Sequence, residues 1–237
     1  MTGQSQVMKS VENTQVKTSI IVPAYNEERG LPLVLEKLYQ TVDSSYEVIV
    51  VNDGSKDATG SAAGAFPCRV IEHGVNQGKG AAMQTGLQHT RGENIIFIDA
   101  DGTYPVSVIP AMVELLESHD MVVGSRSRGR SNMPLLNRLG NWLFSTLMHF
   151  LHGTKTCDPL SGLYGIKKQY LDKMHLRSRN FAIETEISIK AARLGLNVTE
   201  IQVDYLPRHG QQKLSALRDG WRILKVILGE MLNRRQS

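Results

Sequence analysis

The sequence alternates between short, continuous apolar runs and longer amphipathic stretches. Runs rich in β-branched residues and bounded by turn residues are typical of strands buried on both faces of a sheet. We predict such strands at residues 18–22, 46–51, 68–72, 94–98 and 121–124. Apolar residues at helical spacing predict helices at about 27–42, 80–90 and 105–118, the last beginning at Pro105. This alternation predicts a single α/β domain with a mostly parallel central sheet and helices on both faces.

Both ends of the chain, and one internal stretch, depart from this alternation. Residues 1–16 are polar and aperiodic, so we expect a flexible arm before a domain that spans 17–217. Residues of about 130–152 and 218–237 are basic and amphipathic. Each fits either a helix packed on the core or an interfacial helix with its apolar side in a membrane boundary. No apolar run approaches the ~18 residues of a spanning helix, and the distant Cys68 and Cys157 suit a reducing compartment.

The charge of the chain is small but unevenly placed. In 237 residues, 27 Lys and Arg against 23 Asp and Glu give a net charge of +4. The stretch between Asp120 and Asp158 has five cations and no acid, and the stretch from Pro207 onward carries another +5, which leaves −6 for the rest. Two basic stretches on an acidic body indicate an anionic partner. Because no nucleic-acid motif is present and aromatic residues interleave poorly with the basic stretch, we expect no nucleic-acid partner.

Polar residues follow three of the predicted strands, where ligands bind in open α/β sheets. Asp99 and Asp101 suit either a divalent cation completed by substrate phosphates or an aspartate-rich turn. Asp53 suits either hydrogen bonding to a nucleoside or an Asx turn. The loop at 76–80 has neither the spacing of a P-loop nor the third glycine of a dinucleotide motif. ATPase and dehydrogenase functions are therefore disfavoured.

Taken together, the motifs resemble glycosyltransferase family 2, which has the GT-A (Rossmann-like) fold. The family motifs in the first half are Pro23–Glu28, Val51–Ser55, Asn76-x-Gly78-Lys79-Gly80 and Asp99–Asp101. In the second half, the sequence is similar to the polyprenyl-phosphate sugar synthases, such as the dolichyl-phosphate mannose and glucose synthases. The motifs there are Gly124–Arg126, Arg138–Asn141, Asp158–Gly162, the Glu184/Glu186 segment and Arg208-x-Gly210-x-x-Lys213. The resemblance covers about residues 18–217.

This resemblance implies an inverting, metal-dependent transfer of a hexose from a GDP- or UDP-linked sugar to a polyprenyl (dolichyl-type) phosphate. It places Pro23, Tyr25, Glu27, Asp53, Lys79 and Asp99 on the nucleotide sugar. Asp101 would bind Mg²⁺ or Mn²⁺ with Thr103, which stands where many mannose synthases have Gln; mannose, glucose and an N-acetylhexosamine therefore all stay open as donor sugars. Arg208 and Lys213 would close over the diphosphate, and Arg126 and Arg138 would bind the acceptor phosphate. The catalytic group would be Asp101, Arg126, Arg208 and Lys213.

The resemblance also gives an expected location and leaves an alternative acceptor open. We expect a peripheral enzyme at the cytoplasmic face of a membrane, docking by itself or through a membrane partner subunit. The alternative is a family 2 enzyme that glycosylates a soluble or glycan hydroxyl, with Asp158, Glu184 or Glu186 as the base. An anionic-surface binding module is disfavoured because it would not need Asp99 and Asp101.

Overall fold

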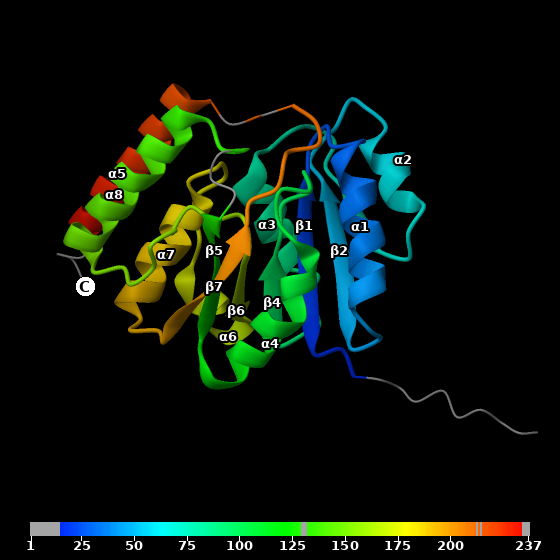
Figure 1. The fold of residues 1–237 in the computed structure, drawn as a ribbon, viewed down its shortest axis with the longest axis horizontal. Helices are drawn as coiled ribbons and strands as arrows, with labels where there is room; N and C mark the ends of the chain where they lie inside the picture. The colour runs from blue at the N-terminus through cyan, green and yellow to red at the C-terminus, as the bar shows by residue number, and fades with distance from the viewer. Residues whose placement is uncertain (1–14, 129–131, 212, 214, 234–237) are drawn as a thin grey trace, which may run out of the picture.

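The computed structural model describes residues 15–128, 132–211, 213 and 215–233, and its centre is a seven-stranded sheet (Figure 1). The strands are β1 (Thr18–Ala24), β2 (Tyr46–Asn52), β3 (Arg69–Glu72), β4 (Asn94–Phe97), β5 (Met121–Arg128), β6 (Tyr164–Lys167) and β7 (Val198–Asp204). Their order in the sheet is β3-β2-β1-β4-β6-β5-β7. Only β6 runs antiparallel to its neighbours β4 and β5 among the described strands, so the prediction of a mostly parallel sheet is confirmed.

Helices cover both faces of this sheet, as the sequence predicts. They are α1 (Gly30–Thr41), α2 (Thr59–Gly64), α3 (Lys79–Leu87), α4 (Ile109–Ser118), α5 (Leu135–His152), α6 (Lys168–Met174), α7 (Ile183–Arg193) and α8 (Ala216–Asn233), with a 3₁₀ turn at Val106–Val108. One core layer joins α1 and α4 to the sheet through Leu35 and Met112. The other joins α3, α6 and α7 through Met83, Leu171 and Ile187.

Several boundaries differ from the sequence prediction. The fourth helix begins at Ile109 instead of Pro105, because a 3₁₀ turn lies between them. The first begins at Gly30, since residues 27–29 form the turn that follows β1. The fifth strand continues past Gly124 to Arg128, with a bulge in its pairing to β7. The predicted arm at 1–16 lies outside the described residues except for its last two.

Helices α5 and α8 form a separate layer that packs on α7 (Figure 1). Their shared core includes Met148 from α5, Ile189 from α7 and Ile227 from α8. The two helices run in the same direction, because residues near their ends also meet: His152 Nε2 lies 2.9 Å from the Ile227 carbonyl oxygen. Among the described residues, no helix is both long and apolar enough to cross a membrane.

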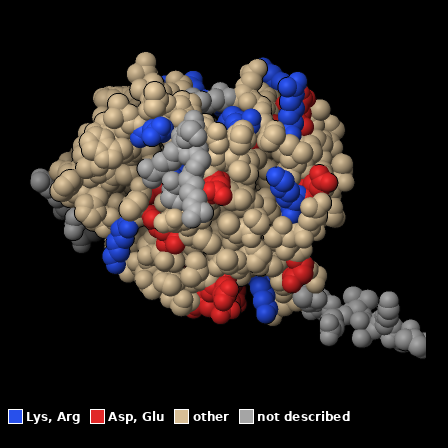
Figure 2. Space-filling model, viewed as in Figure 1, with Lys and Arg blue, Asp and Glu red and all other residues tan. Residues whose placement is uncertain are grey.

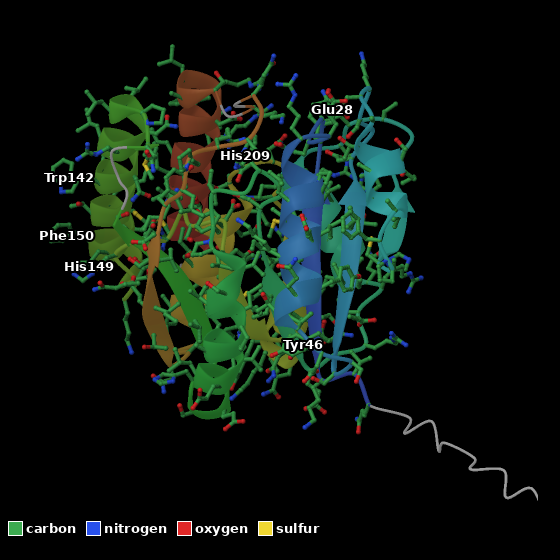
Figure 3. All side chains as sticks on the ribbon, turned by 45° about the vertical axis from the view of Figure 1, so that its right-hand side comes forward. Glu28, Tyr46, Trp142, His149, Phe150 and His209 are labelled. Carbon is green, nitrogen blue, oxygen red and sulfur yellow. The ribbon has the colours of Figure 1, made fainter. Side chains whose placement is uncertain are left out.

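The outer face of this two-helix layer is apolar and exposed. Figure 2 shows mostly uncharged residues over α5 and α8, and Figure 3 shows Trp142 and Phe150 projecting away from the body of the protein. Trp142 and Phe150 are 64% and 79% exposed. On α8, Leu217, Trp221 and Leu232 are exposed as well. These helices therefore bury one face against the fold and leave the other without a described partner.

Candidate active site

The candidate site lies at the carboxyl ends of β1, β2 and β4. The register pairs Ala24 with Asn52, so the segments that follow β1 and β2 emerge side by side. They border a cavity of about 180 Å³. All six predicted nucleotide-sugar residues line it, together with three of the predicted catalytic residues: Pro23, Tyr25, Glu27, Asp53, Lys79 and Asp99, with Asp101, Arg208 and Lys213. The fold thus brings together residues from five motifs that are distant in sequence.

Asp53 holds the loop that precedes α3. Its Oδ1 accepts a hydrogen bond from the Gln77 backbone N–H (2.9 Å) and lies 2.7 Å from His73 Nδ1, and its Oδ2 accepts one from the Gly78 N–H (2.8 Å). Gly78 has φ +101°, and a side chain there would collide with the Arg179 carbonyl oxygen. Asp53 is therefore a loop anchor whose position in the cavity wall is fixed by three hydrogen-bonding partners.

Lys79 at the start of α3 forms a buried ion triad. Its Nζ lies 2.5 Å from Asp99 Oδ1 and 2.5 Å from Glu184 Oε1 at the start of α7. Burial lowers the pKa of Lys79, but the two carboxylates outweigh burial and raise it. Burial raises the pKa of Glu184. Position 162 must be glycine, because a Cβ there would collide with the Asp99 carboxylate. The triad therefore fixes Asp99 between the nucleotide cavity and the space beyond it.

Asp101 is oriented from both sides of its carboxylate. Its Oδ1 accepts hydrogen bonds from the Thr103 N–H (2.9 Å) and hydroxyl (2.6 Å). Its Oδ2 lies 2.5 Å from Arg208 Nη2. Thr103 is fully buried and does not line the cavity. Both donors of Thr103 hold Asp101, so Thr103 positions this carboxylate, and its role as a metal ligand stays a prediction.

The donor set suits a divalent cation held mainly by its substrate. The described residues contain no cluster of three or more His, Cys, Asp or Glu side chains that could enclose a metal. Mg²⁺ sites commonly use one or two carboxylates, with substrate phosphates as the other ligands. Asp101 provides such a carboxylate, and its Oδ2 already faces a cation, the Arg208 guanidinium. The residues present therefore fit Mg²⁺ or Mn²⁺ bound together with a diphosphate.

The segment between β7 and α8 passes over the carboxyl ends of the strands, and Figure 3 places His209 at this end of the sheet. The His209 N–H donates to the Asp101 carbonyl (3.0 Å). Lys213 Nζ lies 2.5 Å from Glu27 Oε1, and burial raises the pKa of Glu27 to about 7 despite this ammonium. The buried Glu27 Oε2 has no hydrogen-bond partner among the described residues. It is therefore an acceptor available to a ligand.

A second cavity of about 240 Å³ adjoins the first. Lys79, Asp99 and Arg208 line both cavities, so their contents would meet at these side chains. Arg126 lines the second cavity and is paired with the buried Asp158 through Nε (2.7 Å) and Nη2 (2.5 Å). Burial raises the pKa of Asp158, but the Arg126 guanidinium outweighs this and holds the pKa below its usual value. Arg126 is thus a cation rigidly presented at the second cavity.

Arg138 lies apart from the other predicted residues. It is exposed on α5 and lines an outer groove of about 770 Å³, which Arg126 also borders. It lines neither of the two joined cavities. The structure thus brings Arg126 and Arg138 together in this outer groove, outside the two joined cavities. Their role at the acceptor phosphate stays a prediction.

Sequence reasoning missed two arginines of the first cavity. Arg218 and Arg222 of α8 line it, four residues apart and so on one helix face. Arg222 Nη1 is held 2.8 Å from Oδ1 of the fully buried Asp219, which also accepts the Ser215 N–H. The spacing Arg218-x-x-x-Arg222 was visible in the sequence. That this helix turns back to the nucleotide cavity was not.

A mostly parallel α/β sheet with a cation-rich cavity at its strand ends, adjoining a second cavity, is the arrangement expected of a glycosyltransferase with the GT-A fold. Residues 19–175 match the sequence model of glycosyl transferase family 2. The chain is 32% identical over 219 residues, 92% of this chain and 95% of the relative, to the dolichyl-phosphate hexose transferase of Haloferax volcanii. The chain therefore belongs to glycosyltransferase family 2, and the resemblance to the polyprenyl-phosphate sugar synthases is confirmed.

A further relative and a solved structure agree with this assignment. The chain is 29% identical to the undecaprenyl-phosphate mannosyltransferase of Micrococcus luteus, a match that covers 82% of this chain and 86% of the relative. The crystal structure of glucosyl-3-phosphoglycerate synthase from Mycobacterium tuberculosis with Mn²⁺ and UDP-glucose superposes with a TM-score of 0.70 at 27% identity. That match covers 90% of this chain and 79% of the solved chain. Relatives of this fold thus include an enzyme crystallised with a divalent metal and a nucleotide sugar.

Proposed function

We propose that the protein transfers a hexose, with inversion, from a GDP- or UDP-sugar to a polyprenyl phosphate. The observation that carries this proposal is the pair of joined cavities. The first offers carboxylates and cations to a nucleotide diphosphate, and the second offers a rigid arginine, while its two described carboxylates, Asp99 and Glu184, are both paired with Lys79. A phosphate acceptor is already an anionic nucleophile. The enzyme then needs to position two anions and stabilise the leaving diphosphate.

The first cavity suits the donor. Asp53 and Glu27 offer carboxylate acceptors to the nucleoside, and five cations line the wall: Lys79, Arg208, Lys213, Arg218 and Arg222. A divalent metal at Asp101 would supply charge to the departing diphosphate. The Arg208 guanidinium now paired with Asp101 would then be released toward the diphosphate oxygens. Fixed cations aimed at a developing charge contribute strongly in a site that excludes water.

The second cavity suits a phosphate acceptor better than a hydroxyl acceptor. A hydroxyl needs a general base within hydrogen-bond reach. The three carboxylates considered for that role are committed elsewhere: Asp158 to Arg126, Glu184 to Lys79, and Glu186 to the N–H groups of Arg177 and Ser178 and to Lys190. Lys79, Arg126 and Arg208 instead give this cavity three cations, which favour a phosphate oxygen as the nucleophile.

The exposed outer face of α5 and α8 suits a membrane surface. Leu135, Leu139, Trp142 and Phe150 of α5 are exposed, and Arg138 and Lys155 lie beside them in the outer groove. Apolar side chains flanked by basic residues are typical of helices that lie in a lipid interface, where anionic headgroups attract the cations. This supports peripheral attachment to the cytoplasmic face of a membrane, directly or with a membrane partner subunit.

The test is a panel of labelled sugar nucleotides incubated with the enzyme, Mn²⁺ and polyprenyl phosphate, followed by organic extraction. Label in the organic phase from one donor is the expected result and identifies that donor. A parallel series replaces the lipid with 3-phosphoglycerate and free sugars, because a structural relative is named for glucosyl-3-phosphoglycerate. Transfer to these soluble acceptors with none to the lipid would establish the alternative, a family 2 enzyme for hydroxyl acceptors.

A further inference from the structure

We propose that the phosphate-proximal isoprene units of the acceptor pass between the N-terminal halves of α5 and α8, and that Gly140 and Gly220 set the width of this passage. The inference rests on the proposed function, because it assigns a path to the lipid of that reaction. It concerns the part of the second cavity farthest from the nucleotide. There the lining changes from charged residues to apolar ones.

The passage is continuous with the reaction space. Lys79, Asp99 and Arg208 form the polar end of the second cavity and are shared with the nucleotide cavity. The other end is formed by α5 and α8, through Leu136, Gly140, Phe144, Ala216, Gly220 and Ile223. A molecule with an anionic head and an apolar tail fits this order, with the head near Arg126 and the tail between the helices.

The two glycines leave this space open. A Cβ at Gly140 would meet only the Phe144 ring, at 3.9 Å, and a Cβ at Gly220 would meet only the same ring, at 3.7 and 3.9 Å. These are ordinary contacts, and neither glycine has a positive φ. Neither backbone strain nor crowding therefore requires glycine at these positions, and glycine is unfavourable inside helices. Both positions lie in the wall of one cavity, next to the same edge of the Phe144 ring.

The open end of the passage is rimmed by exposed apolar side chains. Leu136 lines the cavity and is 60% exposed. On α8, Leu217 and Trp221 directly follow the cavity-lining residues Ala216 and Gly220 in the sequence and are 86% and 59% exposed. An apolar cavity of ~150 Å³ holds a benzene-sized group. The whole cavity, at about 240 Å³, therefore has room for the phosphate and an isoprene unit only. The rest of the chain would leave through this rim into the lipid that contacts α5 and α8.

Leucine substitutions test the passage, and α8 offers a matched control. Gly220→Leu and Gly140→Leu place a branched side chain in the cavity from either helix. Gly229→Leu makes the same change on α8 where a Cβ meets no atom within 4 Å. The assay is transfer of labelled sugar to polyprenyl phosphate in detergent micelles, which removes any effect on membrane docking. Titration with UDP and with GDP in the presence of Mn²⁺ reports whether each variant keeps a folded donor site.

Both passage variants should lower kcat/KM for polyprenyl phosphate by roughly 10- to 200-fold, the range for a small steric change in an apolar pocket. They should keep the wild-type nucleotide affinity, and Gly229→Leu should keep both properties. Wild-type kcat/KM in both passage variants, or an equal loss in Gly229→Leu, would refute the passage alone. Weakened nucleotide binding in both would also refute it, since the glycines would then act on the donor site. No lipid-linked product from the wild-type enzyme would refute the proposed function and the passage together.

Discussion

Replacing Asp101 by asparagine removes one charge from the centre of the proposed site and changes little else. The amide oxygen can still accept the two hydrogen bonds that Thr103 donates to Oδ1. The lost contact is the charge pair between Oδ2 and Arg208, together with the only carboxylate we assign to the metal. Loss of one key electrostatic group costs about 10²-fold in turnover, or about 2.7 kcal/mol in the activation free energy. We therefore expect Asp101→Asn to fold and to lose roughly this factor.

The assay for this variant is the initial rate of sugar transfer across a Mn²⁺ titration, with Asp172→Asn as the control. Asp172 is an exposed aspartate on α6, so its substitution should leave the rate and the metal dependence unchanged. Asp101→Asn should need more Mn²⁺ and reach a lower plateau. Near-wild-type turnover of Asp101→Asn at saturating Mn²⁺ would refute the assignment of the metal and diphosphate to this carboxylate.

Three other predictions address the donor, the buried ion pair and the membrane. Arg222→Gln should raise the KM for the sugar nucleotide about tenfold, as expected for the loss of a charge-assisted hydrogen bond. The control Lys225→Gln, on the exposed side of α8, should leave this KM unchanged. Equal KM values for the two variants in steady-state kinetics would remove Arg222 from the donor site. Asp158→Asn should destabilise the fold by roughly 3–5 kcal/mol at pH 7, because it removes the carboxylate that balances the buried charge of Arg126. The pKa of Asp158 in the folded protein lies below its usual value of 3.8. The loss of stability in the variant is therefore full above pH 3.8 and shrinks as the pH falls through the pKa of the folded state. Urea unfolding of both proteins at pH 7 and pH 3 measures this loss, and an equal loss at the two pH values would contradict the pairing. The protein should float with anionic vesicles at low salt and detach as the salt concentration rises. Trp142→Asp should weaken this binding, because Trp142 is exposed on α5. No flotation at any salt concentration would exclude direct docking on the membrane.

The predictable parts of the fold are those in which one strand or helix carries its own signal. β1, β2 and β4 are buried on both faces, so their apolar runs are unbroken in the sequence. β6 was not predicted because Gly165 and Lys167 leave no continuous apolar run in its sequence. β7 was not predicted because it is an edge strand whose Glu200 and Gln202 interrupt the apolar run. Strands of this kind form through their neighbours, which a local pattern does not contain.

The residues of the candidate site likewise divide into those that the sequence could place and those that it could not. Residues that directly follow a parallel strand, such as Asp53 and Asp99, were placed correctly because strand ends meet at one edge of the sheet. Contacts that depend on how distant elements fold back were not predictable. Lys79 pairs with Glu184 from α7, and Arg222 of α8 reaches the nucleotide cavity. Arg138, to which a motif match gave a role at the acceptor phosphate, lines the outer groove together with Arg126, and that role stays a prediction.

The central claim is that only the sugar moves, from a nucleotide diphosphate to a lipid phosphate. A donor labelled with ¹⁴C in the sugar and ³²P in the β-phosphate tests this most directly, with polyprenyl phosphate as the acceptor and organic extraction as the readout. We predict that ¹⁴C enters the organic phase while ³²P stays in the aqueous phase as the nucleoside diphosphate. Transfer of both labels to the lipid, or of neither, would contradict the account.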